Sequence, residues 1–222
     1  MKKTVTEALA KFGLGVVLVA ALVFLPAGTL RFPNGWLLMA VLFLPMLAAG
    51  AVLIVKRPSL LEQRLKNKES RREQSLVVKL SGLMFIVGFT LAGLDFRFGW
   101  TDLPDWVSCA AAALFLLAYL LYVEVLRENP WLSRTVEVQA EQTVVDTGLY
   151  GIVRHPMYSA TLLLFLSMPL ILGSLLSFAV FLAYPMILLK RIRDEEALLA
   201  EELEGYDAYR QKVRWRLLPY IW

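Results

Sequence analysis

Long apolar runs, separated by short charged stretches, follow one another along the whole chain. A helix needs about 20 mostly apolar residues to cross a hydrocarbon core of about 30 Å. Four runs have this character, namely Phe12–Pro26, Trp36–Val55, Leu76–Leu94 and Trp106–Leu126. The pattern therefore predicts four membrane-spanning helices in the first half of the chain.

A fifth apolar block, Ser159–Leu189, is too long for one crossing and has a proline and a glycine near its middle. Glycine can adopt the positive φ that ends a helix, and serine can cap the next helix, so Leu172-Gly173-Ser174 predicts a turn. Two short helices, Ser159–Leu172 and Leu175–Leu189, are expected to form a hairpin that is tilted or incompletely inserted.

The basic residues divide unevenly between the connections. All 23 Lys and Arg residues except Arg31 and Arg97 lie in the N-terminal arm, between residues 56 and 79, or after the fourth span. Because cytoplasmic loops carry the excess of Lys and Arg, this split predicts four alternating spans with both termini cytoplasmic. Arg154 and Lys190 then share a side, which requires the fifth block to fold back on itself.

Composition places the chain in the membrane class. Hydrophobic residues make up 58% of it and the mean hydropathy is +0.60, against about 45 to 50% apolar residues in soluble proteins. The basic, apolar N-terminus lacks a signal-peptide cleavage site, so a retained first span is expected. The net charge of +4 fits membrane orientation and anionic headgroups rather than nucleic acid. Cys109 is the only cysteine, which excludes an intramolecular disulfide and a cysteine metal cluster.

We expect an all-α integral membrane protein that forms one structural unit of five to six membrane helices, four spans plus a C-terminal helical hairpin. The expected parts are four spans in 1–127 with a basic cytoplasmic connection at 56–75, a loop at 128–158, the hairpin at 159–189 and a C-terminal interfacial helix at 190–222. The basic connection is expected to be an interfacial amphipathic helix or a solvated loop against anionic lipid. Valines 136, 138, 144 and 145 indicate short extended segments or turns, and the aspartates near residue 100 indicate a solvated turn.

Two ionisable clusters bracket the fifth block. Gly148–Tyr158 reads GLYGIVRHPMY and includes the only histidine, His155, whereas Lys190–Glu196 reads KRIRDEE. Arg191 and Glu195 are four residues apart and share a helical face, which alone indicates an ordinary ion pair. A single histidine before a proline is also more often structural than catalytic. If the hairpin closes, however, both clusters reach the same membrane face, and the combination favours a ligand site.

The order of these motifs resembles the isoprenylcysteine carboxyl methyltransferase family, including its bacterial members, and the related phospholipid methyltransferases. The matching elements are GLY-x3-RHPMY, an apolar hairpin, R-x3-EE-x2-L, GYDAYRQKV and, upstream, ENPWLSRTVEVQ. The resemblance is strong from Glu128 to Trp222 and covers the rest only by span layout. It implies a methyltransferase that uses S-adenosylmethionine, with a cofactor-binding catalytic region at 128–222, in a prokaryotic cytoplasmic membrane with the active site on the cytoplasmic side.

The resemblance also implies roles for individual residues. Positions that match the family's contacts to S-adenosylmethionine, or to its product S-adenosylhomocysteine, are Gln139, Gln142, Val144, Val145, Tyr150, His155, Pro156, Met157, Tyr158 and Glu195. Gln142 departs from the family, in which a histidine is frequent. Arg154 and Arg191 match arginines near the reacting group, and Arg191 and Asn129 match substrate positions. Glu196 is expected to form a salt bridge that shapes the site.

The methyl acceptor stays open at this stage. The spans imply a lipophilic small molecule or lipid that enters between helices, surrounded by membrane lipids, with no metal required. A carboxylate is already ionised near pH 7 and can be oriented by arginines, which favours an isoprenylcysteine-like carboxylate or a lipid headgroup over an amine or thiol. Two rival functions remain. Membrane sterol reductases have a similar RHP-x-Y region that binds NADPH, and a non-enzymatic protein could use the charged loops to bind lipid or a partner.

Overall fold

A computed structural model describes residues 2–56, 72–132 and 137–222. The helices are α1 (Lys2–Ala27), α2 (Pro33–Lys56), α4 (Arg72–Phe98), α5 (Asp105–Glu128), the 3-10 turn η1 (Gly148–Gly151), α6 (Pro156–Ile171), α7 (Leu175–Phe181), α8 (Tyr184–Glu202) and α9 (Tyr206–Lys212). The described residues contain no strand, so the all-α expectation is confirmed. The amphipathic helix or loop expected at 56–75 lies mostly outside the described residues.

Among the residues that the structure describes, five stretches are long and apolar enough to cross a membrane, by length and composition. Four of them correspond to α1, α2, α4 and α5 and confirm the four expected spans. The fifth comprises α7 and α8 together, Leu175–Glu202, and α6 is a shorter apolar helix. Many apolar side chains on α1 and α2 are exposed, as Leu14 is at 68% and Val55 at 80%, which is the surface that lipid would cover.

The turn between α6 and α7 has the expected chemistry. Gly173 has a φ of +75°, and the hydroxyl oxygen of Ser174 accepts a hydrogen bond from the backbone N–H of Ser177. A positive φ is unfavourable for residues with a Cβ, so glycine allows the chain to reverse at this point. The hairpin therefore closes where the sequence predicted.

The second arm of the hairpin differs from the expectation. It is interrupted after Phe181, just before the Tyr184-Pro185 start of α8, because proline lacks the N–H that would continue the helix. Beyond residue 189 there is no boundary, and α8 continues to Glu202 because no glycine or proline follows Pro185 until Gly205. At about 1.5 Å per residue, 28 residues span about 40 Å, more than the hydrocarbon core. The charged end of α8 thus projects beyond the apolar layer.

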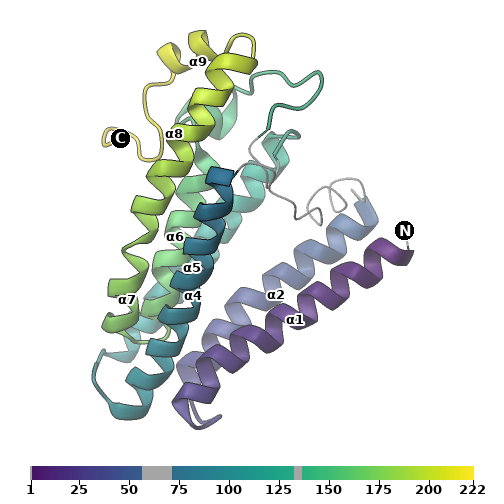
Figure 1. The fold of residues 1–222 in the computed structure, drawn as a ribbon. Coiled ribbons are helices and arrows are strands. Elements are labelled where there is room, and N and C mark those ends of the chain that lie inside the picture. The colour runs from purple at the N-terminus through teal and green to yellow at the C-terminus, as the bar shows by residue number, and fades with distance from the viewer. Residues whose placement is uncertain (1, 57–71, 133–136) are drawn as a thin grey trace.

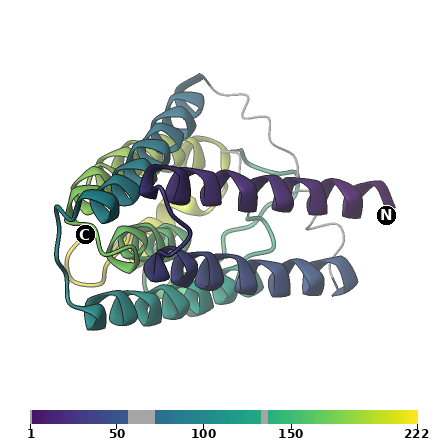
Figure 2. The same cartoon turned by 90° about the horizontal axis from the view of Figure 1, so that it is seen from below.

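The helices form two groups. Helices α4, α5, α6 and α8 make a bundle, whereas α1 and α2 contact it near the turn that joins them and lean away from it at their other ends (Figures 1 and 2). The close contact is between α1 and α4. A Cβ on Gly93 of α4 would lie 2.5 Å from the carbonyl oxygen of Val23, so glycine permits this approach.

A buried polar cluster ties the bundle together at the end opposite α9. Asp95 is only 2% exposed, and its carboxylate accepts hydrogen bonds from the Thr101 N–H and hydroxyl, at 2.7 Å each, and from the Ser174 hydroxyl. The solvated turn expected here is thus wrong for Asp95, which is buried and bonded to Thr101 and to Ser174 of the hairpin turn, but right for the exposed Asp102 and Asp105. Burial with three donors satisfies this carboxylate.

Candidate active site

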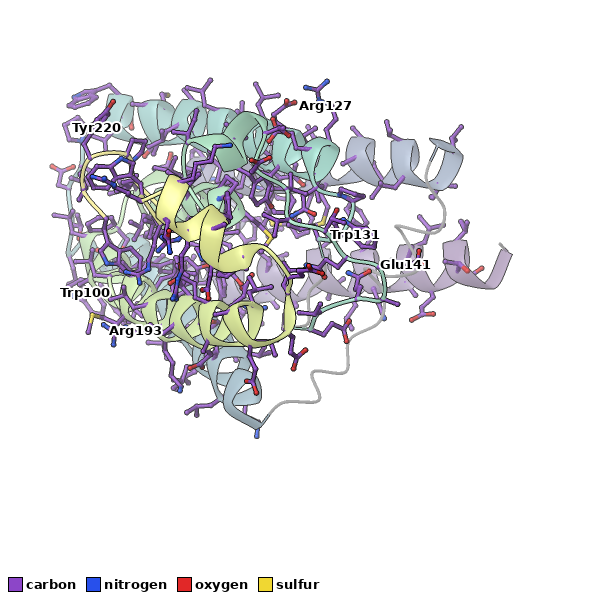
Figure 3. All side chains as sticks on the ribbon, turned by 90° about the horizontal axis from the view of Figure 1, so that it is seen from above. Trp100, Arg127, Trp131, Glu141, Arg193 and Tyr220 are labelled. Carbon is purple, nitrogen blue, oxygen red and sulfur yellow. The ribbon has the colours of Figure 1, made fainter. Side chains whose placement is uncertain are left out.

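The candidate site lies at the end of the bundle where α9 crosses the projecting part of α8 (Figures 1 and 3). The loop between α5 and α6 and the segment after α9 meet there. The backbone N–H groups of Arg154 and His155 donate to the carbonyl oxygens of Trp215 and Arg216, both at 2.9 Å. We call Gly148–Tyr158 the motif loop and Val213–Trp222 the C-terminal segment, and these hydrogen bonds hold the two side by side.

The extended segments or turns expected around Val138 and Val144 form a loop with a turn at residues 140–141 and no strand. Both side chains instead pack against a cluster that includes Leu203 and Tyr206. Val136 lies outside the described residues. The loop is therefore fixed by burial of its valines against α8 and α9 rather than by a sheet.

Glu196 is a buried carboxylate that bonds to three basic side chains next to the site. Its Oε1 accepts from Arg154 Nε at 2.8 Å and lies 3.2 Å from His155 Nε2, and its Oε2 accepts from Arg216 Nε at 2.8 Å. Glu196 and Arg154 are both more than nine-tenths buried. Arg154 Nη1 also donates to the carbonyl oxygen of Val213 at 3.1 Å. A buried carboxylate thus joins α8, the motif loop and the C-terminal segment.

Glu195, the adjacent residue, points elsewhere, because successive residues on a helix face different directions. Its Oε2 accepts a hydrogen bond from the Tyr158 hydroxyl, and Arg191 Nε donates to that same hydroxyl at 2.9 Å. The Arg191 guanidinium carbon also lies 5.8 Å from the Tyr158 ring centre. The hairpin therefore brings α8 beside the motif loop, as the sequence predicted.

These residues line a pocket between the motif loop, α8 and α9. Of the predicted site residues, the pocket is lined by Asn129, Gln142, Val144, Val145, Tyr150, Arg154, His155, Met157, Tyr158, Arg191 and Glu195. Two do not line it. The Gln139 amide donates to the Trp131 carbonyl oxygen at 2.6 Å, and its backbone N–H donates to Gln142 Oε1 at 2.9 Å. Pro156 is buried as the first residue of α6.

Sequence reasoning missed part of the pocket wall. The additional lining residues are Trp131, Leu132, Glu137, Thr143, Leu198, Leu199, Leu203, Tyr206 and Tyr209. Figure 3 shows Trp131 and Glu141 on the loop that runs beside the ends of α8 and α9. The helical spacing of Leu198, Leu199, Leu203 and Tyr206 was the available signal, since such spacing indicates one apolar face but not what that face covers.

Three tyrosines, Tyr150, Tyr206 and Tyr209, are called the site tyrosines below. The Tyr209 hydroxyl donates to the Tyr150 carbonyl oxygen at 2.7 Å, and Asn129 donates to the Tyr150 hydroxyl at 2.9 Å. Burial raises the pKa of all three phenols above the usual 10.0, so they stay neutral at physiological pH. At the rim, the Lys212 ammonium, 2.7 Å from Asp146, lowers the pKa of that carboxyl.

A second, apolar groove reaches the same place from within the bundle. Helices α4, α5, α6 and α8 line it with residues such as Gly82, Phe85 and Phe165. Met157, Tyr158 and Arg191 border both the polar pocket and the groove. Polar and apolar ligands could therefore approach one point from different sides. Among the described residues, no group of three or more His, Cys, Asp or Glu side chains could hold a metal ion.

Comparison with known proteins finds a family model that matches the region of the site. Residues 109–201 match the model of the isoprenylcysteine carboxyl methyltransferase family. The matched residues make up less than half of the chain, and this part of it is similar to that family. The matched region contains the motif loop, the hairpin and the Arg191 to Glu196 turn of α8, and so most of the residues that line the pocket.

Two other comparisons found similar proteins. The structure of the eukaryotic intramembrane Ras methyltransferase ICMT is similar, with a TM-score of 0.59 and 23% identity over 96% of this chain and 75% of that one. This likeness shows a shared fold. A Delta(14)-sterol reductase of Methylotuvimicrobium alcaliphilum is 29% identical over 136 residues, or 54% of this chain. The matched part spans only 32% of that relative's length.

Proposed function

We propose that this protein is an S-adenosylmethionine-dependent methyltransferase that transfers a methyl group to a lipophilic acceptor at the cytoplasmic face of the membrane. The observation that carries the proposal is the meeting of the polar pocket and the apolar groove at Met157, Tyr158 and Arg191. A water-soluble methyl donor would enter the pocket from the aqueous side. A membrane-dissolved acceptor would reach the same point through the groove.

The residue types of the pocket fit the cofactor. Glu195 offers a carboxylate that can accept hydrogen bonds from ribose hydroxyls or from the cofactor ammonium. Val144, Leu199 and Tyr206 offer an apolar and aromatic wall for adenine. His155 can bond the cofactor carboxylate or an adenine nitrogen. The family match, which includes the motif loop and α8, supports the same donor.

When bound, the cofactor supplies a methyl group already activated on a sulfonium, so the chain's own task is binding, alignment and exclusion of water. Tyr158 and Arg191 would do the aligning, because they are hydrogen-bonded to each other at the junction of pocket and groove. Holding the two reactants at near-attack distance is the main contribution a protein can make to such a displacement.

We propose an anionic acceptor, and an isoprenylcysteine-like carboxylate in the first place. A carboxylate is ionised near pH 7 and needs no general base, and the Arg191 guanidinium can orient it. Arg154 is better placed as a positioning residue, since the bonds described above direct its guanidinium to Glu196 and Val213. Its place in the pocket wall would then follow from its role in holding the motif loop.

Methyl transfer from labelled S-adenosylmethionine to an isoprenylated cysteine analogue tests the proposal. Gly82 lines the groove, and a Cβ there would meet nothing within 4 Å, so Gly82→Phe is the substitution chosen to obstruct the groove. We expect this variant to lose methyl transfer while it binds S-adenosylhomocysteine as the wild type does. Gly50→Phe on α2, which also has open space around it, is the matched control and should keep both properties. Equal transfer by both variants would contradict the groove assignment.

The likeness to a Delta(14)-sterol reductase favours a second candidate, a membrane reductase that uses NADPH. It carries less weight because only about a third of that relative is matched. The two functions need different cofactors in the same pocket. A protein that consumes NADPH with a sterol substrate and transfers no methyl group would decide for the reductase.

A further inference from the structure

Tyr206 has a buried hydroxyl with no hydrogen-bond partner among the described residues. Its side chain is only 3% exposed, yet it lines the polar pocket. Buried polar atoms almost always have a partner, so an orphaned hydroxyl at a pocket wall indicates that a ligand supplies one. Ser177 Oγ is the other such atom in the described part of the chain, and it lies away from the pocket beside Gly88 of α4.

The backbone holds Tyr206 in this position. Gly205, with a φ of +82°, turns the chain between α8 and α9, and Tyr206 is the first residue of α9. Its ring packs with Leu203, Tyr209 and Val213, three buried residues. The ring is therefore fixed on the wall by packing, without any contribution from its hydroxyl.

We propose that the Tyr206 hydroxyl donates a hydrogen bond to the nucleoside part of the cofactor, a role that rests on the function proposed above. The wall around Tyr206 is aliphatic, with Val144, Leu199 and Leu203, and suits a flat heterocycle with ring-nitrogen acceptors. Glu195, which can accept from the ammonium of the amino-acid end, is bonded to Tyr158 at the border of the groove.

The electrostatics of the wall agree with a donor role. Burial raises the pKa of the Tyr206 phenol, with Glu196 and Glu195 adding to the increase and Arg154 opposing it. The phenol therefore keeps its proton throughout the physiological range, so it can donate a hydrogen bond.

Tyr206→Phe tests this directly, because it removes the hydroxyl and keeps the packed ring. Titration calorimetry with S-adenosylhomocysteine should show a Kd about three- to tenfold weaker than wild type, the range expected for one net hydrogen bond. The ligand-free variant should melt no lower than wild type, since no partner is lost. Ser177→Ala, which removes the other orphaned hydroxyl, is the matched control and should leave the Kd unchanged.

The same titration with 5′-methylthioadenosine, which has the nucleoside but no amino-acid end, locates the contact. We expect the same fold-loss for Tyr206→Phe with both ligands. An unchanged Kd, a loss seen with S-adenosylhomocysteine alone, or a lower melting temperature of the ligand-free variant would each overturn the inference. Wild-type protein that binds neither ligand would instead contradict the proposed function itself.

Discussion

Removing the Glu196 carboxylate should strongly destabilise the end of the protein that carries the site. Glu196→Ala would leave Arg154, whose side chain is 7% exposed, without its buried counter-charge, and would release Arg216 and His155. Breaking a buried pair by removing one partner costs about 3 to 5 kcal/mol. The two backbone carbonyls that accept from Arg154 Nη1 remain, so the lower part of this range is expected.

The expected loss is readily measured by thermal melting in detergent, followed by tryptophan fluorescence. At about 2 to 4 °C per kcal/mol for a chain of this size, Tm should fall by about 10 °C. Glu196→Gln keeps the shape of the side chain without its charge, and its Tm should lie between those of the wild type and Glu196→Ala. Glu201→Ala, on the exposed face of the same helix, is the matched control. If Glu196→Ala melted as high as Glu201→Ala, the buried network would not hold the site together and the reasoning would be refuted.

Three further outcomes are expected. Gly93→Ala should destabilise the protein by about 1 to 3 kcal/mol, because its Cβ would meet the backbone of α1. Gly50→Ala, which has open space around it, should instead raise Tm, because alanine favours a helix more than glycine does. Equal melting temperatures of the two variants would count against the described packing. Asp95→Asn should lower the free energy of unfolding by about 1 to 3 kcal/mol, because an amide NH2 group would replace one of the oxygens that accept from Thr101 and Ser174. Chemical unfolding measures this loss, and an unchanged unfolding midpoint would contradict the described hydrogen bonds. Burial raises the pKa values of the site tyrosines in the folded protein, whereas in the unfolded chain these phenols lose their protons at a pH of about 10. The stability that the neutral phenols contribute should therefore be fully present below about pH 10 and should fall as the pH rises above it. Tyr209→Phe should make this alkaline decline of Tm shallower, and a decline of equal slope would exclude Tyr209 as a contributor.

The sequence predicted the spans and the hairpin because both depend on local features. Apolar runs indicate helices wherever they occur, and Gly173 followed by Ser174 indicates a turn irrespective of what surrounds it. The divergence of α1 and α2 from the bundle was not predictable from the sequence. Lipid is as apolar as a neighbouring helix, so a helix face that contacts lipid and one that contacts another helix have similar apolar residues. The burial of Asp95 was missed for a related reason, as its partner Ser174 is 79 residues away.

The motif loop and α8 were predicted to meet, and they do. What the sequence could not show was how two adjacent carboxylates divide their roles. Glu195 faces the pocket and accepts from Tyr158, whereas Glu196 faces inward to Arg154, and this follows from the rotation of α8 in the assembled bundle. Tyr206 was missed because its apolar helical spacing is equally typical of an ordinary packed face.

A pair of calorimetric titrations of the purified protein, one with S-adenosylhomocysteine and one with NADPH, tests the central claim most directly. The claim is that the pocket bordered by Tyr158, Arg191 and Glu195 binds a methyl-donor nucleoside. We predict saturable binding of S-adenosylhomocysteine, its loss in the folded Glu195→Ala variant, and no binding of NADPH. Saturable binding of NADPH together with no binding of S-adenosylhomocysteine would contradict the account.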